Sequence, residues 1–485
     1  MINIENIINE LRKNNIKEEK IQEVEKAYNL AAEIHKNQFR QSGEPYIVHP
    51  LSVALNVIKM HVYDTDTICA ALLHDTIEDA PYEFTKEDVA ELINPTVAEL
   101  VDGVTKLRRM NFSTETEQNN ANTRKIINGL TKDIRIIVIK LADRLHNMET
   151  LEFKKPEKQR KIALETMELF VPISYAIGEY RIKSELEDLS LKYIDPIEYI
   201  RIKEDKDILA EIEKDYLQEM TYKISELLKQ RNIANEILFR EKNVWTAYKK
   251  IRNGFKIENI YDLFYLKILV NEVDECYQTL CCVHSNNRPI NGRFKDYIFN
   301  PRTNLYQALH TTVSDSNGKL TKVKIRTYDM DKVAGFGMPA LWTMKNGKTL
   351  EETQSELNEK CQFAKKLIEI DDTTENNEDF IREIKNELLS DHVYVYTHTG
   401  EIKELPSGST AVDFICQVFP DQLDQVTGIL VNGKEMPLYY ELKQNDRLQV
   451  VTNGKVSKEN WIDYAHSETS KLKIKKLFNE RHNNQ

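Results

Sequence analysis

The spacing of apolar residues changes along this chain, and that change limits the folds it can adopt. From about residue 1 to 195 apolar side chains recur at three- and four-residue steps, as in AYNLAAEIHKNQF and TICAALLHDTIED, which is typical of helices that bury one face. From about residue 236 the pattern differs: YDLFYLKILV (261–270) and KLTKVKIRTY (319–328) alternate and are rich in β-branched residues, which indicates strands. The sequence therefore predicts an all-α region followed by an α+β region, and its 485 residues are enough for about three domains.

Local composition divides the chain further. Residues 196–235 read as charged helical segments that connect the first two regions, and EIDDTTENNEDF (369–380) is acidic and poor in apolar side chains, as linkers are. HVYVYTHTGEIKELPSGSTAVDF, GILVNGKEMPL and DRLQVVTNG are alternating segments separated by turn signals, which predicts a compact β-rich unit. The predicted parts are 1–195, 196–368, a linker at 369–390, the β-rich unit at 391–455 and a basic helical tail at 456–485.

Charge and cysteine content exclude several classes of protein. The formal net charge is −11, which argues against a DNA-binding protein because nucleic-acid affinity depends on excess positive charge. The longest apolar stretches, such as IRIIVIKLA at 134–142, are far shorter than the roughly 20 residues of a membrane helix, and the N-terminal segment does not resemble a signal peptide. The six cysteines form no CxxC pair. We therefore expect a cytoplasmic protein with free thiols and without a membrane or DNA partner.

Polar residues gather in two apolar helical segments of the first region, ALLHDTIEDA and KLADRLHNMET. Within each segment they recur at i, i+4 or i+7, so on a helix they would share faces. Polar groups on the core side of a helix are costly unless they are compensated, and a divalent cation with His and carboxylate ligands would compensate them. An isolated His-Asp pair is usually a capping or surface pair, so the prediction rests on the whole set. Its members are His74, Asp75, Glu78, Asp79, Asp143, Asn147 and Thr150.

The motifs FRQSGEPYIVHP, LLHDTIED, LVDGVTKL and IKLADRLHNMETL follow one another in this order. With them the first region resembles the HD-domain hydrolases, and specifically the N-terminal half of the RelA/SpoT-homologue family of (p)ppGpp synthetase-hydrolases. The resemblance implies four Mn²⁺ ligands, namely His49, His74, Asp75 and Asp143. Two His and two Asp that leave coordination positions open suit Mn²⁺ better than structural Zn²⁺.

The same resemblance implies roles for the residues around the metal. Glu78 and Asp79 would handle the attacking water, and Arg40 would pack against the guanine of the substrate. Asn147 and Thr150 would contact the nucleoside. Position 41 is glutamine where the family carries a basic residue, which is a mild departure.

The second region resembles the synthetase part of the same family. The motifs that carry this resemblance are FREKNVWTAYKKI, IYDLFYLKILV, INGRFKDYIFNPRTNLYQALHTTV and KVKIRTYDMDKVAGFGMPALW. The resemblance implies a nucleotidyltransferase-like α+β fold. In active members of the family, this domain transfers pyrophosphate from ATP to GDP or GTP. Asp262 would be the catalytic aspartate, and Tyr306 would stack on guanine.

This region departs from the family where its chemistry is carried out. Lys322 replaces the essential Glu, and residues 322, 324 and 326 on one face of a strand are all cationic. A Lys ammonium neither accepts a proton nor binds Mg²⁺, so we expect the synthetase domain to be inactive. Mg²⁺ would be a cofactor only of an active synthetase. Arg240, Lys242, Arg302 and Tyr306 leave two interpretations open, a retained nucleotide site or a solvated basic face. The further departures are Lys267 for Arg, Phe239 and Leu305 for Gly, and Asn243 and Leu341 for His.

The third region resembles a TGS domain, a small β-grasp module. Phe419 stands at the position of a His that helps contact tRNA in the long ribosome-associated forms, so contact with the ribosome or tRNA is doubtful and the partner of this unit is unknown. About 30 residues later the chain ends, without the further C-terminal modules of those forms. A naturally short protein and a truncated one are both compatible with this.

Together these features predict a Mn²⁺-dependent (p)ppGpp 3′-pyrophosphohydrolase of the stringent response, with an inactive synthetase domain. Its substrate would be the guanine nucleotide alarmone, and its products GDP or GTP and pyrophosphate. Three alternatives stay open: a bifunctional enzyme that retains GTP diphosphokinase activity, a non-catalytic alarmone-sensing module, and an HD site that acts on another nucleotide. The presence of Glu78 and Asp79 argues against the sensor, because a protein that only binds has no use for them.

Overall fold

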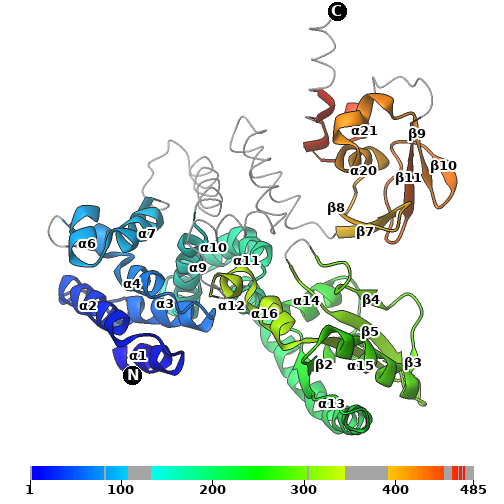
Figure 1. Ribbon diagram of the computed structural model, residues 1–485. Helices are drawn as coiled ribbons and strands as arrows, with labels where there is room; N and C mark the ends of the chain where they lie inside the picture. Colours follow the sequence, from blue (N-terminus) through cyan, green and yellow to red (C-terminus); the bar gives the residue numbers. More distant parts are fainter. Residues whose placement is uncertain are drawn as a thin grey trace, which may run out of the picture. The chain divides into compact units, whose positions relative to one another are not determined.

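The computed structural model describes residues 3–80, 84–106, 133–302, 305–343, 392–452, 461–467, 469–471 and 473–475. The chain forms two compact units, of which the first contains the helical and α+β regions and the second the β-rich region (Figure 1). The expected linker at 369–390 and most of the expected tail at 456–485 lie outside the described residues, as does the side chain of Leu341. Among the described residues no helix has both the length and the apolar character that a membrane span requires.

The helical region is built around three helices with little polar surface. All residues of α4 except Asp66 are buried, and α3 and α9 pack against each other, with α4 beside α3. Most residues of α3 and α9 are buried as well, so these three helices form the core on which the other helices pack. The helices are α1 (Ile4–Lys13), α2 (Glu18–Ile34), α3 (Val48–Lys59), α4 (Thr65–Leu73), α5 (Thr76–Asp79), α6 (Lys86–Leu92), α7 (Pro95–Lys106), α9 (Ile134–Glu149), α10 (Pro156–Glu165), α11 (Val171–Ala176) and α12 (Tyr180–Ile194).

LLHDTIED does not form the single helix on which the face-sharing argument relied. Helix α4 ends at Leu73 and α5 begins at Thr76, so that His74 and Asp75 lie in the turn between them. Two side chains take over local hydrogen bonds at this break: His74 Nδ1 lies 2.8 Å from Ala71 O, and Thr76 Oγ1 donates to Leu73 O at 2.6 Å. Such local side-chain bonds compete with helix continuation. The break aims His74 and Asp75 at a common point, which an unbroken helix would not do.

The α+β region is a mixed sheet covered by helices on one face. Helix α13 (Pro196–Gln230), α14 (Val244–Arg252) and α15 (Val273–Asn286) accompany strands β1 (Glu236–Glu241), β2 (Phe264–Val270), β3 (Arg288–Pro289), β4 (Lys295–Asp296), β5 (Leu309–Ser314) and β6 (Leu320–Thr327). The order is β1-β2-β6-β5-β3, with β4 also on β5 and with β2 and β6 parallel. Val323 and Ile325 are fully buried in the core that includes α13 and α15, as the alternating pattern of 319–328 predicts.

After β6 the chain returns to the helical region through α16 (Tyr328–Thr343). Gly337 has a φ of 57°, and a Cβ placed there would lie 2.1 Å from Ile177 O. Met338 N donates to that same carbonyl at 2.8 Å. Only glycine combines this φ with so close an approach, so this position ties the strand that carries Lys322 to the start of α12.

Beside that contact, Glu179 is a fully buried carboxylic acid that caps α12. Its Oε1 accepts a hydrogen bond from Ile182 N, while its Oε2 has no hydrogen-bond partner among the described residues. Burial raises its pKa from 4.5 to about 8. Folding therefore takes up a proton between these two values, so the free energy of unfolding should fall as pH rises from about 4.5 to 8.

Glu179→Gln should remove this pH dependence, because glutamine is neutral at every pH. We expect the variant to gain stability relative to the parent as pH rises from 5 to 8, by roughly 2–5 kcal/mol at the upper end. Thermal unfolding followed by circular dichroism across this range measures the difference, with the exposed Glu157→Gln as control. Parallel pH profiles for Glu179→Gln and the parent would contradict the assignment.

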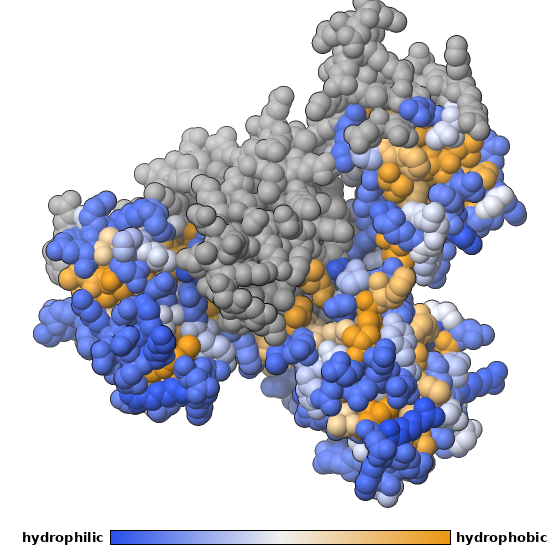
Figure 2. Space-filling model, in the orientation of Figure 1, coloured by the Kyte–Doolittle hydropathy of each residue, from blue (hydrophilic) through white to orange (hydrophobic). Residues whose placement is uncertain are grey.

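The second unit is a five-stranded sheet with one helix across it. Its elements are β7 (His392–Thr397), β8 (Ile402–Pro406), α20 (Ala411–Val418), β9 (Gly428–Val431), β10 (Lys434–Met436), β11 (Arg447–Val451) and α21 (Trp461–Tyr464). The order is β10-β9-β11-β7-β8, with β7 and β11 parallel and the other pairs antiparallel. Phe414 and Trp461 anchor its core, and apolar residues show on the face of the unit seen in Figure 2. This is the expected β-grasp arrangement, and the multidomain fold class is confirmed.

Candidate metal centre

Four buried side chains of the helical region converge on one point. His49 comes from α3, His74 and Asp75 from the turn after α4, and Asp143 from α9. His49 Nε2 lies 3.5 Å from Asp75 Oδ2 and 3.4 Å from Asp143 Oδ1, and His74 Nε2 lies 3.2 and 4.0 Å from the same two atoms. The ligand atoms of His49, His74 and Asp143 all lie within 4.8 Å of one another. The structure thus brings all four predicted metal ligands together.

Both histidines turn their Nε2 atom toward this point. His74 donates its Nδ1 proton to Ala71 O, and its buried Nε2 makes no hydrogen bond within the described structure, although Asp75 Oδ2 is near. His49 Nδ1 lies 2.8 Å from Nδ1 of His146, which in turn lies 3.0 Å from an Arg40 nitrogen. Burial lowers the pKa of His146 to about 3, so its ring is neutral. Because Arg40 can only donate, His146 Nδ1 is an acceptor and His49 Nδ1 carries the proton.

The charges at the centre favour a cation. Burial opposes ionisation of Asp143, but the Lys140 ammonium 2.7 Å away and the histidines hold the pKa of Asp143 well below its usual range. The pKa of Asp75 is also held well below its usual range, by His74 and His49 against the effect of burial. Two ionised carboxylates and two imidazoles are ligands that suit a divalent metal. The residues present therefore fit a divalent metal site.

The predicted substrate residues extend from the metal centre as one hydrogen-bonded row. Asn147 Nδ2 donates to Asp143 Oδ1 at 2.6 Å. Arg40 NH2 donates to Asn147 Oδ1 at 3.4 Å and to Thr150 Oγ1 at 3.2 Å. Asp143 and Asn147 lie on α9 with Thr150 directly after it, in the stripe that their i, i+4, i+7 spacing predicts. Arg40 is only partly buried, so its guanidinium is available to a ligand.

The acidic pair lies at the rim of the site on α5. Glu78 and Asp79 are both partly exposed. The hydroxyl of Tyr46 donates toward Asp75 Oδ2 at 2.7 Å and Asp79 Oδ2 at 3.0 Å, and Gln38 Nε2 donates to Asp79 O at 2.5 Å. Tyr46 therefore joins a predicted metal ligand to one of the residues expected to handle water.

The sequence analysis assigned no role to His146, Tyr46 or Lys140, although all three lie within or beside the quoted motifs. Each acts through another residue: His146 on His49, Tyr46 on Asp75 and Asp79, and Lys140 on Asp143. A usable signal was present for His146, because a histidine at i+3 from Asp143 lies close to the same helix stripe. Nothing in the sequence indicates that its ring meets His49, which lies 97 residues away.

Replacing His146 by alanine should weaken metal binding through His49. Without the acceptor at its Nδ1, the His49 ring loses its fixed tautomer and orientation, which typically costs 10- to 100-fold in metal affinity, so we expect about that loss. Competition with a fluorescent chelator measures the affinity. His61→Ala, another histidine of this region that lies outside the centre, is the control. An unchanged metal affinity in His146→Ala would show that His146 does not position the ligand.

At the synthetase-like site, the expected catalytic aspartate is enclosed by ammonium groups. Asp262 is buried directly before β2 and forms ion pairs with Lys242 and Lys250, and Lys322 Nζ lies 3.6 Å from its Oδ2. Burial opposes its ionisation, but Lys242 and the other lysines hold the pKa of Asp262 well below its usual range. Lys322, which is expected to stand in place of a glutamate, therefore adds to the positive charge that Lys242 and Lys250 place around this carboxylate.

The other expected synthetase residues lie apart from this contact. Arg240 is exposed on β1. Tyr306 is only 7% exposed, its hydroxyl meets His310 Nε2 at 2.7 Å, and the guanidinium groups of Arg302 and Arg326 lie over its ring. The ring of Tyr306 is thus not open for a base to stack on it.

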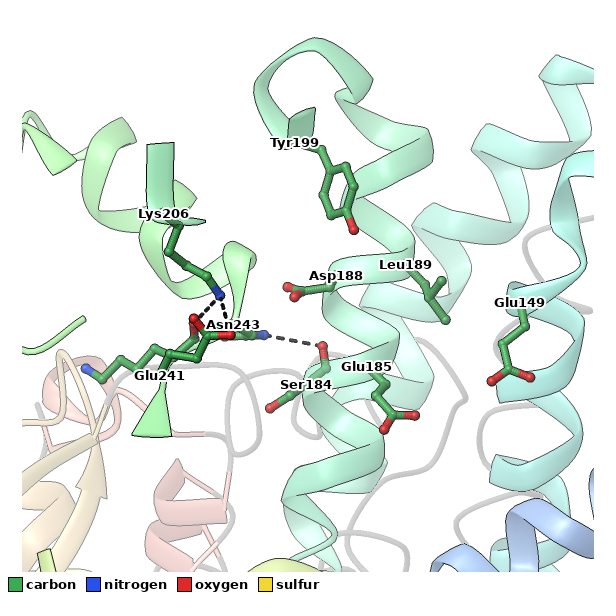
Figure 3. A pocket seen from close by; sticks show the side chains of 10 residues that line it. Glu149, Ser184, Glu185, Asp188, Leu189, Tyr199, Lys206, Glu241 and Asn243 are labelled. Atoms are coloured by element: carbon green, nitrogen blue, oxygen red, sulfur yellow. Dashed lines mark hydrogen bonds and ion pairs between the residues drawn. The ribbon is translucent and has the colours of Figure 1, made fainter. Parts of the chain in front are cut away.

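A separate cavity of ≈470 Å³ lies where α12 faces α13 and the end of β1 (Figure 3). Lys206 and Lys242 contribute cations to its lining, and Glu149, Glu185, Asp188 and Glu241 contribute carboxylates. Its lining includes none of the four residues of the metal centre. The cavity therefore does not enlarge that site.

Comparison with known families matches three segments of the chain. Residues 27–178 match the HD domain, residues 239–349 the region found in RelA / SpoT proteins, and residues 393–452 the TGS domain. The guanosine-3′,5′-bis(diphosphate) 3′-pyrophosphohydrolase of Aquifex aeolicus is 37% identical over 95% of the chain. The bifunctional (p)ppGpp synthase/hydrolase SpoT of Escherichia coli is 36% identical over 97% of it, and the GTP pyrophosphokinase of Myxococcus xanthus 36% over 94%. The matched part covers 65%, 67% and 60% of these three proteins, respectively.

Proposed function

The chain belongs to the RelA/SpoT family of (p)ppGpp synthetases and hydrolases, and on that premise we propose that it is a Mn²⁺-dependent (p)ppGpp 3′-pyrophosphohydrolase. The observation that carries the proposal is the convergence of His49, His74, Asp75 and Asp143, with both imidazole Nε2 atoms facing the two carboxylates. The names of the relatives alone do not decide between hydrolase and synthetase, since they include both activities. The residue chemistry of the two sites favours hydrolysis.

In this proposal each group around the centre has one task. The four ligands hold the metal, which when bound supplies Lewis acidity that polarises a phosphoryl oxygen and acidifies water. Glu78 and Asp79 orient the water and accept its proton, with Asp79 held in place by Tyr46. Arg40, Asn147 and Thr150 bind the guanine nucleoside. The oxygen of water adds to the phosphorus attached to the ribose 3′-oxygen, and the bond between that oxygen and phosphorus breaks. The proton taken up by the acidic pair passes to the 3′-oxygen, so that GDP or GTP and pyrophosphate leave.

The donor set supports a divalent transition metal, and the resemblance to the family favours Mn²⁺ among these ions. Imidazole nitrogens with carboxylate oxygens bind divalent transition metals, whereas Mg²⁺ prefers oxygen ligands. Protein stripped with EDTA and resupplied with Mn²⁺, Mg²⁺ or Zn²⁺ should degrade labelled ppGpp fastest with Mn²⁺. Undiminished hydrolysis in the continued presence of EDTA would contradict a metal-dependent site.

The synthetase-like domain is inactive in this proposal, because Lys322 and its neighbours neutralise Asp262. A protein that only senses alarmone would not need the acidic pair on α5 beside a complete metal site. We place the enzyme in the cytoplasm with its nucleotide substrate. Phe419, at the end of α20, offers no hydrogen-bonding group for tRNA, so we propose no ribosome partner.

A further inference from the structure

One face of the α+β sheet collects positive charge. Lys267 on β2 is in register with Lys324 on β6, Tyr265 with Lys322, and Leu269 with Arg326. Residues in register point to the same side of a sheet, and the opposite side holds the apolar core with Val323 and Ile325. The cations of both parallel strands therefore lie on the face that the core does not cover.

Among the described residues, two carboxylates lie against these cations, and each of them contacts more than one cation. Asp262 contacts three ammonium groups, while Asp331 on α16 pairs with Lys267 Nζ at 2.8 Å and Arg326 NH2 at 2.5 Å. The cations of this cluster, here named the Lys322 cluster, are Lys242, Lys250, Lys267, Lys322, Lys324 and Arg326. When all are charged, these six cations exceed the two carboxylates by four charges, in a chain whose net charge is −11.

Lys324 shows most clearly that the cluster lacks an anion. Its ammonium lies 4.1 Å from the centre of the Tyr265 ring, and among the described residues it forms no ion pair. Burial, followed by the positive charges of Lys322 and Arg326, lowers the pKa of Lys324 well below its usual range. A half-buried cation without a counter-charge is unfavourable, and a bound anion would reduce that cost.

The cluster is open to a small anion on one side. The side chains of Lys322 and Lys242 are each 21% exposed and that of Lys250 is 31% exposed, whereas Asp262 behind them is 7% exposed. The ammonium groups, and not the carboxylate, therefore face an incoming ligand. Because the ring of Tyr306 is buried, recognition here falls on phosphate groups and not on a base.

We propose that the Lys322 cluster binds linked phosphates, as in pyrophosphate or the phosphate chain of a nucleotide, without a divalent cation. The ammonium of Lys322 supplies there the positive charge that a bound metal would otherwise provide. Lys ammonium groups bind phosphate as compact point charges, and several of them around one site act together. This binding is independent of the proposed hydrolysis, since it needs no metal.

Calorimetric titration of the full chain with inorganic pyrophosphate in excess EDTA tests the proposal. We expect binding that persists without metal and weakens with added salt. Lys322→Gln should weaken it about tenfold, the size expected for one charge-assisted hydrogen bond. Lys256→Gln, an exposed lysine of the same domain, should leave it unchanged. Equal affinities of the two variants, or binding only when Mg²⁺ is present, would overturn the proposal.

Two further measurements complete the test. Titration with other ligands identifies the chemical group that is bound, and thermal unfolding shows whether the variant is still folded. Guanosine should not bind, and GDP and ADP should match pyrophosphate within about threefold; a guanine preference of about tenfold or more would overturn recognition by phosphate alone. Lys322→Gln should keep the parent's thermal unfolding midpoint within a few degrees, because Asp262 retains Lys242 and Lys250. Pyrophosphate bound at the metal centre would not respond to Lys322→Gln and would also count against the proposal. Loss of hydrolysis alone leaves the binding result unaffected, so the two proposals fail separately.

Discussion

Replacing Asp75 by alanine should reduce the hydrolysis of ppGpp by about 100-fold or more, the usual range for groups that act directly in catalysis. The substitution removes the one of the two ionised carboxylates that lies within 3.5 Å of both histidine Nε2 atoms. It also removes an acceptor of the Tyr46 hydroxyl, which holds Asp79. Metal binding and water handling should therefore fail together.

The measurement is release of labelled pyrophosphate with Mn²⁺ at saturating ppGpp. Glu78→Ala should cause a similar loss of turnover but keep metal affinity, because Glu78 belongs to the predicted water-handling pair and not to the ligand set. Glu33→Ala, an exposed carboxylate of the same domain, is the matched control. Near-normal rates for Asp75→Ala with Mn²⁺ would show that the site is assigned wrongly.

The synthetase-like domain should fold and yet form no ppGpp from ATP and GDP. Its sheet is complete and its core strand residues are buried, but three ammonium groups surround Asp262. These positive ammonium groups repel a divalent cation. The interaction of one pair of unit charges at 4 Å is worth about 4 kcal/mol at an effective dielectric constant of 20. A Mg²⁺-nucleotide complex therefore lacks the anionic ligands it needs at this place.

Synthesis is best measured in an Asp75→Ala background, so that hydrolysis does not remove the product. Lys322→Glu with Lys324→Gln restores the pattern of the family, and we expect at most weak synthesis from it. Leu305 is unchanged in this variant. Its φ of 65° lies in a region that favours glycine, the residue expected at this position from the family. Robust ppGpp formation by protein that retains Lys322 would promote the bifunctional alternative.

Local pattern was sufficient for most of the secondary structure and for part of the site. The i, i+4, i+7 spacing of Asp143, Asn147 and Thr150 places them along one stripe of α9, because a helix repeats every 3.6 residues whatever surrounds it. The alternation of 319–328 likewise places Lys322 and Lys324 opposite Val323 and Ile325. Periodicity of this kind is a property of neighbouring residues, so the sequence contains it.

Only the tertiary structure decided which distant groups meet. His49 and His146 are 97 residues apart, and their contact depends on how α3 packs against α9. The break at His74 and Asp75, which the helical pattern of LLHDTIED conceals, aims two ligands at that contact. In the second region the sequence determined how many cations lie on β6. The tertiary packing brings Lys242, which follows β1, and Lys250 on α14 onto Asp262 with Lys322. Electrostatic interactions depend on distance in space and not along the chain, so the chemistry of both sites was settled by packing.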